Sequence, residues 1–151
     1  MGFKVGFIGT GNMGTPLLKG LLSSGAAKPD DVYIYDVDHT KSGRLAKETG
    51  VNQASSNEEL VSACDYIVLA VKPAYIRQVL EEIQGVFTDA KVLVSIAVGV
   101  TTKTLKSIIG DKVKVVRTMP NLPVLVGEGM TLVCFGPEIG EGERQVVRSL
   151  F

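Results

Sequence analysis

Cysteine and histidine are scarce in this sequence, and their scarcity limits the chemistry it offers. The two cysteines, Cys64 and Cys134, lie far apart in the chain, and His39 is the one histidine. No Cys-x-x-Cys pair occurs, and these three residues are too few for a four-ligand zinc site. The sequence therefore spells out no metal or redox site, and we expect both cysteines to be reduced and buried as small apolar residues.

Net charge and long apolar runs are lacking as well. The chain has 16 Lys+Arg against 16 Asp+Glu, and the basic residues are scattered, so we expect no nucleic-acid partner. Apolar runs such as residues 66–71 are far shorter than the ~20 residues of a membrane-spanning helix, so we expect no membrane association. A strand pattern begins at Phe3, which leaves no room for a cleaved leader, so we expect a cytoplasmic protein.

What the sequence does contain is a regular alternation of short apolar runs and amphipathic stretches. Its 151 residues fit one domain, 1–151, with a sizeable core. Strands are predicted at residues 3–8, 32–35, 66–71, 92–96, 113–117 and 130–135, and helices at 12–24, 40–49, 56–64, 73–84, 102–109 and 141–151. This alternation predicts an α/β fold of the Rossmann-like, doubly wound type, with a mostly parallel sheet and helices on both faces.

Glycine recurs where the predicted helices end. Gly25, Gly50, Gly85 and Gly110 each follow such an end, so we expect positive φ angles at all four. The last stretch, 141–151, has an apolar stripe but is followed by neither a glycine nor a polar exit. We therefore expect the chain to be part of a longer protein, and the stripe to lack the partner against which it should pack.

A glycine-rich segment joins the first predicted strand to the first predicted helix: Gly9-Thr10-Gly11-Asn12-Met13-Gly14. In a Gly-x-Gly-x-x-Gly loop the first glycine permits a tight turn, the second lets a pyrophosphate approach the backbone, and the third lets the helix pack closely. The pyrophosphate then lies at the helix N-terminus, where free N–H groups and the helix dipole attract it. A generic strand–helix turn would need the glycines for steric reasons alone, but this context favours dinucleotide binding.

Asp36 ends the second predicted strand, about 20 residues beyond the glycine loop, where an acid accepts hydrogen bonds from the adenosine ribose. That position favours NAD over NADP, because a 2′-phosphate would meet a like charge. His39, Lys41 and Arg44 follow and could surround a phosphate, so either NADH or NADPH stays open. The plainer alternatives are a turn at residues 36–38 and a solvated helix face.

Two further loops also follow predicted strands, at the sheet edge where α/β proteins bind ligands. Residues 70–73 read Ala-Val-Lys-Pro, and residues 96–100 are small enough to let a flat ring lie against the backbone. For residues 70–73 the alternative is simple helix initiation at Pro73. Farther along the chain, two prolines bracket Asn121 and predict a stiff, non-helical loop.

Taken together, these segments resemble the pyrroline-5-carboxylate reductase family. Residues 6–14, 70–73, 94–100 and 119–131 follow the pattern of that family in order and at its spacing. The resemblance extends over the whole chain. It implies a hydride transfer from NADPH or NADH to the C=N carbon of 1-pyrroline-5-carboxylate, which yields proline in proline biosynthesis, with this chain as the cofactor-binding part.

The resemblance also implies residue roles. The glycine loop would hold the pyrophosphate, Asp36 and Asn57 would face the adenosine, and Asn121 would lie near the nicotinamide and the substrate. Leu122 departs from the threonine usual in that loop, and Asp36 departs from the small or polar residues of NADPH-preferring members. The implied cofactor residues are Gly9, Thr10, Gly11, Asn12, Met13, Gly14, Asp36, Asn57, Ala70, Val71, Lys72, Pro73, Ile96, Ala97 and Val98.

Members of that family continue into a helical second domain, which forms the dimer and holds the substrate carboxylate and imine. No such segment occurs in these 151 residues. The resemblance therefore implies a homo-oligomer for a longer form, no identified catalytic residue here, and weak or absent turnover by this chain. Two alternatives stay open: a β-hydroxyacid dehydrogenase, which shares the Gly-x-Gly-x-Met-Gly loop, and a non-catalytic dinucleotide-binding regulatory module.

Overall fold

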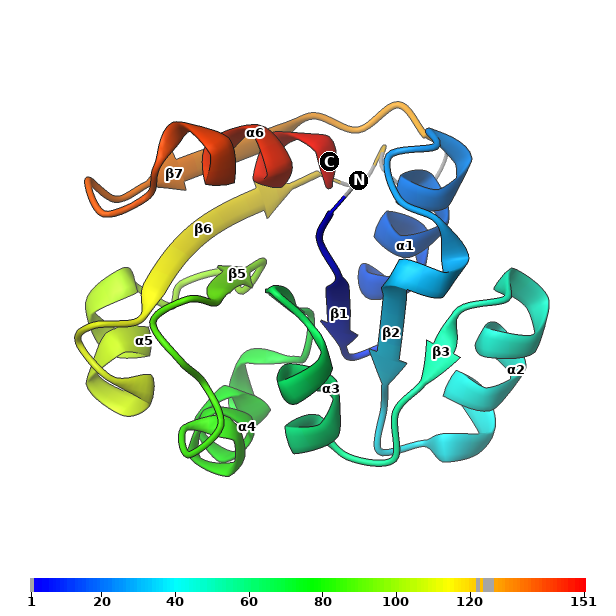
Figure 1. Ribbon diagram of the computed structural model, residues 1–151, viewed down its shortest axis with the longest axis horizontal. Helices are drawn as coiled ribbons and strands as arrows, with labels where there is room; N and C mark the ends of the chain where they lie inside the picture. Colours follow the sequence, from blue (N-terminus) through cyan, green and yellow to red (C-terminus); the bar gives the residue numbers. More distant parts are fainter. Residues whose placement is uncertain (1, 122, 124–126) are drawn as a thin grey trace.

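The structure, a computed structural model, describes residues 2–121, 123 and 127–151. Within these residues seven strands form one sheet in the order β3-β2-β1-β4-β5-β6-β7 (Figure 1). The strands are β1 (Val5–Ile8), β2 (Val32–Tyr35), β3 (Asn52–Gln53), β4 (Tyr66–Leu69), β5 (Val92–Ser95), β6 (Lys114–Pro120) and β7 (Thr131–Phe135). All neighbouring strands pair in parallel except β6 and β7, which are antiparallel. The strand order reverses between β1 and β4, so the predicted doubly wound, Rossmann-like sheet is confirmed.

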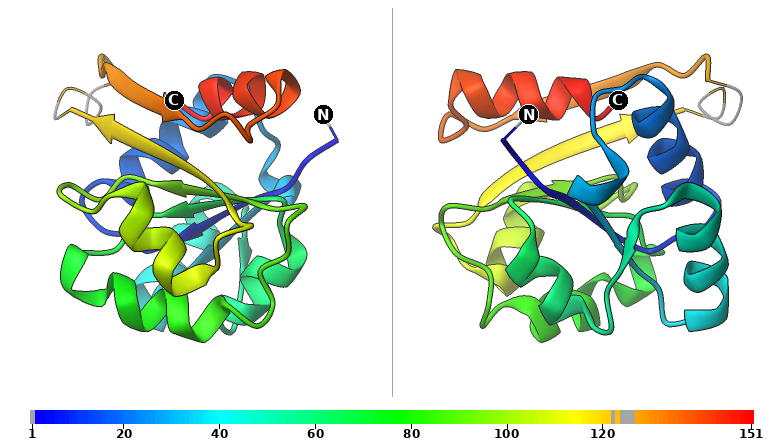
Figure 2. Two further views of the ribbon diagram at one scale, coloured as in Figure 1. Left: turned by 90° about the vertical axis from the view of Figure 1, so that its left-hand side faces the viewer. Right: turned by 45° about the vertical axis from the view of Figure 1, so that its right-hand side comes forward.

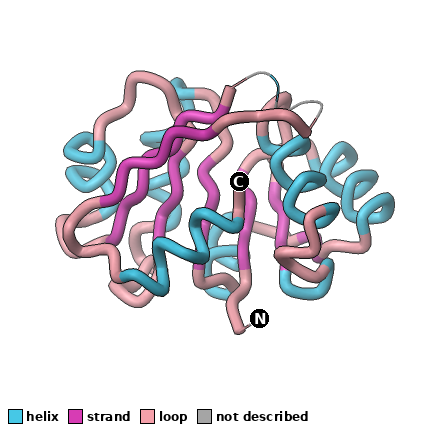
Figure 3. The backbone as a smooth tube through the Cα atoms, turned by 90° about the horizontal axis from the view of Figure 1, so that it is seen from above, coloured by secondary structure: helices cyan, strands magenta, loops and turns pink. Residues whose placement is uncertain are grey.

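Helices cover both faces of this sheet, as predicted (Figures 2 and 3). One apolar cluster joins the sheet to α1, α2 and α6, and the other joins it to α3, α4 and α5. Strand β4 contributes to both clusters, because its side chains alternate between the two faces of the sheet: Tyr66 and Val68 belong to the first cluster, and Ile67 and Leu69 to the second. The helices are α1 (Gly14–Ser23), α2 (His39–Thr49), α3 (Asn57–Ala63), α4 (Ile76–Ile83), α5 (Thr102–Ile109) and α6 (Glu141–Ser149), with 3-10 turns η1 (Pro29–Asp31) and η2 (Pro73–Tyr75).

The apolar stripe of α6 has a partner, so the expectation that it lacks one is wrong. Val147 and Leu150 are 0% and 2% exposed, and both belong to the cluster formed with α1 and the sheet. The reason is the antiparallel pairing of β7 with β6, which returns the chain along the sheet before the helix begins. The stripe of α6 is thus part of the core of this domain.

Two smaller expectations are also corrected. Gly25, Gly50 and Gly110 have the predicted positive φ angles, but Gly85 does not, because α4 ends in a right-handed turn in which the N–H group of Phe87 bonds the carbonyl of Ile83. Cys64 is buried as expected, whereas Cys134 is exposed. On β7 the side chains alternate between faces, and the face of Cys134 is the uncovered one.

No helix in the described residues is long and apolar enough to cross a membrane.

Candidate functional site

The predicted site loops leave the sheet at one edge. Ile8 pairs with both Tyr35 and Leu69, and Leu69 pairs with Ser95, so β1, β2, β4 and β5 end in register. The glycine loop and the loops that begin at residues 36, 70 and 96 therefore start side by side. This edge lies at the point where the strand order reverses, which is where open α/β sheets bind their ligands.

Protein atoms surround the first and third glycines of the loop. Gly9 has a φ of +100°, and a Cβ added there would lie 2.6 Å from the carbonyl oxygen of Ala70. A Cβ at Gly14 would lie 2.3 Å from the carbonyl oxygen of Gly9. Both distances are too short for a side chain, so the steric part of the prediction is confirmed: the turn needs Gly9, and close helix packing needs Gly14.

The second glycine faces open space. A Cβ at Gly11 would meet no atom within 4 Å. After Gly9, whose N–H group bonds the carbonyl of Tyr35, Thr15 is the next residue whose N–H group reaches a backbone carbonyl, that of Gly11 at 3.2 Å. Helix α1 has no side-chain cap. Among the described residues, nothing accepts a hydrogen bond from the N–H groups of Asn12, Met13 and Gly14. Free donors, open space and the positive end of a helix dipole together suit an anion.

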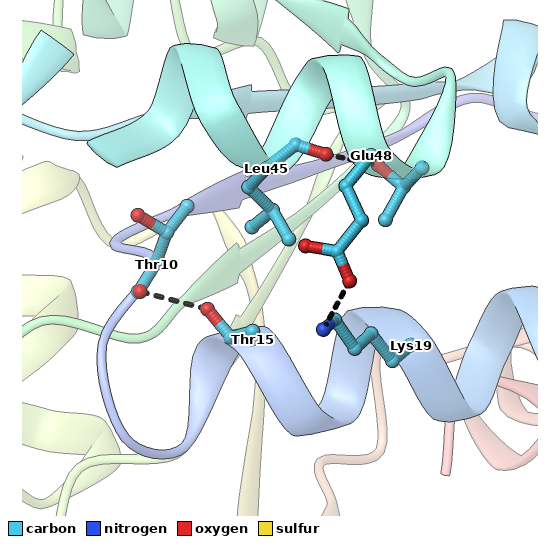
Figure 4. A network of polar contacts seen from close by, with 6 residues as sticks. Thr10, Thr15, Lys19, Leu45 and Glu48 are labelled. Atoms are coloured by element: carbon cyan, nitrogen blue, oxygen red, sulfur yellow. Dashed lines mark hydrogen bonds and ion pairs between the residues drawn. The ribbon is translucent and has the colours of Figure 1, made fainter. Parts of the chain in front are cut away.

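Side chains fix the loop against its surroundings (Figure 4). The hydroxyl of Thr15 donates to the carbonyl of Thr10 at 2.8 Å, and Lys19 on α1 bonds Glu48 on α2 at 2.6 Å. The carboxylate of Asp36 accepts from the N–H group and the hydroxyl of Thr10, at 2.8 and 2.9 Å. The loop therefore has a defined shape before any ligand binds.

Asp36 also accepts a hydrogen bond from the N–H group of Asp38 at 3.0 Å, so the turn-forming role considered for it is present. Partial burial raises the pKa of Asp36, but the hydrogen bonds from Thr10 and Asp38, together with the charge of Lys41, outweigh burial and lower the pKa from its ordinary 3.8. The carboxylate is therefore charged at neutral pH, and it lines a pocket.

That pocket, of about 260 Å³, lies between the glycine loop, the end of β2 and helix α4. Asn57, 5% exposed, donates from Nδ2 to Glu82 at 2.7 Å, and its Oδ1 has no partner among the described residues. The structure thus brings Gly9, Asp36, Asn57 and Val71 together. Four lining residues from η2 and α4 were not predicted as site residues. Val79 was assigned only to the buried stripe, and the periodicity there gives no sign of the other three: Tyr75, Gln78 and Glu82.

The basic residues after β2 do not line this pocket. Lys41 and Arg44 line a separate hollow that they share with Thr15 and Lys19. His39 and Arg44 border a third hollow, together with Lys47. The arrangement in which these cations surround a phosphate beside Asp36 is therefore not formed in this structure.

The predicted residues after β4, β5 and β6 lie at the same edge of the sheet. Of these, Val71 lines the pocket and the others lie outside it. Pro73 begins the 3-10 turn η2, so the helix-initiation role holds for it. After β5, Ala97 is buried and Val98 is 68% exposed. Asn121 joins the ends of β6 and β7: its Oδ1 accepts from the N–H group of Met130 at 2.9 Å, and its own N–H group donates to Met130. Leu122 lies outside the described residues.

Comparison with known proteins gives a family match and close relatives. Residues 4–99 match the family described as NADP oxidoreductase coenzyme F420-dependent. A pyrroline-5-carboxylate reductase of Escherichia coli (strain K12) is 42% identical over 130 residues, which cover 86% of this chain and 48% of the relative. Pyrroline-5-carboxylate reductase 3 of Danio rerio is 39% identical over 147 residues, 97% of this chain and 51% of the relative. The chain thus spans about half the length of these relatives.

Solved structures that superpose on this chain include proteins of the same name as the sequence relatives. A pyrroline carboxylate reductase of Plasmodium falciparum, solved with NADP bound, superposes with a TM-score of 0.88 at 35% identity, covering 99% of this chain and 54% of that one. A pyrroline-5-carboxylate reductase of Coxiella burnetii superposes with a TM-score of 0.93 at 29% identity, covering 98% and 55%. More distant oxidoreductases, under 25% identical, share the fold.

Proposed function

The chain belongs to the family of NADP oxidoreductases described as coenzyme F420-dependent, and we propose that it is the cofactor-binding half of a pyrroline-5-carboxylate reductase. The curated relatives confirm the resemblance drawn from the sequence motifs. They favour this function over a β-hydroxyacid dehydrogenase and over a regulatory module. The proposed reaction is the reduction of 1-pyrroline-5-carboxylate to proline with NADH or NADPH.

The observation that carries the proposal is the open space at Gly11 beside the free N–H groups of Asn12, Met13 and Gly14. A turn built only for steric reasons needs glycine where protein atoms crowd the backbone, as at Gly9 and Gly14. Gly11 meets no such crowding, so the space that its missing side chain leaves is available to a ligand. A pyrophosphate matches both that space and those donors.

The chain's other residues would bind and orient the two ends of the dinucleotide. Asp36 and Asn57 line the pocket beside the loop, which we assign to the adenosine. Residues 70–73 and 96–98 follow β4 and β5 at the same edge, and we assign them to the nicotinamide, with Asn121 on the substrate side. A bound reduced nicotinamide supplies the hydride, and the protein excludes water and holds the reacting faces together.

The test fills the space at Gly11. Gly11→Leu puts a side chain where the pyrophosphate would lie, and its Cβ meets no protein atom within 4 Å, so we expect binding of both NADH and NADPH to fall at least about a hundredfold while the fold is kept. The chain has no tryptophan, so nicotinamide fluorescence reports binding directly, and thermal melting reports folding.

Gly20→Ala is the matched control. Gly20 lies on the same helix α1, and a Cβ there also meets no atom within 4 Å, but it is remote from the loop. Binding by this variant should equal that of the wild type. Unchanged binding by a well-folded Gly11→Leu chain would remove the main support for the proposal.

Two further parts of the proposal concern the protein in the cell. We expect a full-length form to be a homo-oligomer that acts on a small-molecule substrate, which light scattering on that form would test. We expect a cytoplasmic location, which cell fractionation would test.

A further inference from the structure

The pocket beside the glycine loop has two charged lining residues, and both are acids. Asp36 lines it from the end of β2, and Glu82 lines it from α4. None of its described lining residues is a lysine or an arginine. A ligand group that suits this pocket brings hydrogen-bond donors and no negative charge of its own.

Both carboxylates are held in place by neighbouring side chains. Thr10, 1% exposed, binds Oδ2 of Asp36 through its N–H group and its hydroxyl, and Asp38 binds Oδ1. A carboxylate offers about four acceptor positions, so Asp36 keeps one for a ligand. Glu82 accepts from Asn57 at 2.7 Å and from Gln78 at 3.3 Å.

The bond from Asn57 to Glu82 decides which end of the amide is left over. Because Nδ2 is held by Glu82, the unpartnered atom of this buried side chain is the carbonyl oxygen Oδ1. That acceptor is itself buried, in a residue that lines the pocket. The ribose diol and the amino group of an adenosine supply donors, whereas a 2′-phosphate adds acceptors and about −1.5 to −2 charges.

The nearby cations lie outside the pocket. Lys41 and Arg44 line another hollow, where Asp38 and Glu48 are also present. Lys41 does lower the pKa of Asp36, so its charge is felt at the carboxylate, but it is not among the residues that line the pocket. A 2′-phosphate in the pocket would therefore meet Asp36 without a lining cation beside it.

We propose that this chain selects NADH over NADPH, with Asp36 as the specificity-determining residue and Thr10 as the residue that positions it. The inference rests on the proposed function, since it concerns the same dinucleotide site. The Plasmodium falciparum relative was solved with NADP, so the preference would distinguish this chain from that relative.

The experiment titrates the 151-residue chain with NADH and NADPH, and with 5′-ADP and 2′,5′-ADP as fragments that differ by the 2′-phosphate. NADH and 5′-ADP should bind at least about tenfold more tightly than their 2′-phosphorylated counterparts, the effect of a few ångströms of separation between like charges. Raising the salt from about 0.05 to 0.5 M should shrink that ratio, because salt screens the repulsion.

Variants assign the effect to residues. Asp36→Ser should lower the NADH-to-NADPH affinity ratio at least about tenfold, and Thr10→Val, which removes only the hydroxyl donor, should lower it by less. Glu58→Gln removes an exposed acid of α3 that does not line the pocket, and it should leave the ratio unchanged.

The outcomes separate the two proposals. Binding of NADPH as tight as or tighter than NADH overturns the selectivity inference but supports the dinucleotide site, whereas binding of neither overturns the proposed function. A preference for NADH that neither salt nor Asp36→Ser alters overturns the role of Asp36. If Asp36→Ser does not fold, the fragment ratio and its salt dependence in the wild-type chain decide the question.

Discussion

Asp36 accepts three hydrogen bonds, two from Thr10 and one from Asp38, and this gives the stability of the chain a pH dependence. The hydrogen bonds lower the pKa of Asp36 in the folded chain from the ordinary 3.8. A lowered pKa means that the charged form stabilises the fold above about pH 4, and that this contribution is lost as the pH falls through the folded-state pKa.

The measurement compares the wild type with Asp36→Asn in urea unfolding at neutral pH and at about pH 3. We expect the wild type to be the more stable at neutral pH, and the difference to shrink in acid. Thr10→Val, which deletes one of the three donors, should show a smaller change than Asp36→Asn. A stability difference that is the same at both pH values would contradict the lowered pKa.

At the same scale, local motifs predicted part of the site. The glycine loop and Asp36 were found because the turn and the strand end impose residue types at fixed spacing. Glu82 and Gln78 were not found, because they lie on the exposed side of α4, where the apolar period carries no information. Only the tertiary packing of α3 beside α4 brings Glu82 to Asn57, and Gln78 bonds Glu82 in turn.

At the scale of elements, helix α6 is held by its buried face. Leu150, the C-cap residue of α6, is 2% exposed within the cluster of α1 and the sheet. Leu150→Ala should therefore lower the free energy of unfolding by about 2–5 kcal/mol, because it removes buried apolar atoms and leaves a cavity. Urea unfolding gives the value. Gln145→Ala, at an exposed position of the same helix, should change it by less than about 0.5 kcal/mol; an equal loss from both would contradict the packing of α6.

Element prediction succeeded where burial sets a clear pattern. Strands β4 and β5 are buried on both faces and read as continuous apolar runs. Strand β3 has two residues, Asn52 and Gln53, and carries no such run. It pairs with β2, and the side chain of Asn52 bonds the carbonyls of Asp30 and Val32. A contact of this kind, made across the sheet, is invisible to a local window.

At the scale of the whole molecule, the fold class was predictable because every level agreed: alternating elements, glycine at most helix ends, and a glycine loop at the first strand–helix junction. The expectation about α6 failed at this scale. An apolar stripe shows that a helix has a partner, but the sequence does not show whether the partner lies in the same domain or in another one. Here the sheet supplies it.

The last prediction concerns binding without turnover. The chain spans about half the length of its relatives, and the resemblance assigns the substrate carboxylate and imine contacts to segments beyond these 151 residues. The loop, pocket and sheet edge that would hold the dinucleotide are present, and apolar clusters pack on both faces of the sheet that carries them. We therefore expect the 151-residue chain to bind a reduced dinucleotide yet to reduce 1-pyrroline-5-carboxylate weakly or not at all. Following nicotinamide absorbance with the substrate, in samples whose dinucleotide binding is titrated in parallel, tests this. Sustained turnover by the 151-residue chain would show that its own residues suffice to hold the imine against the nicotinamide, because proximity and orientation supply much of the rate of such a transfer.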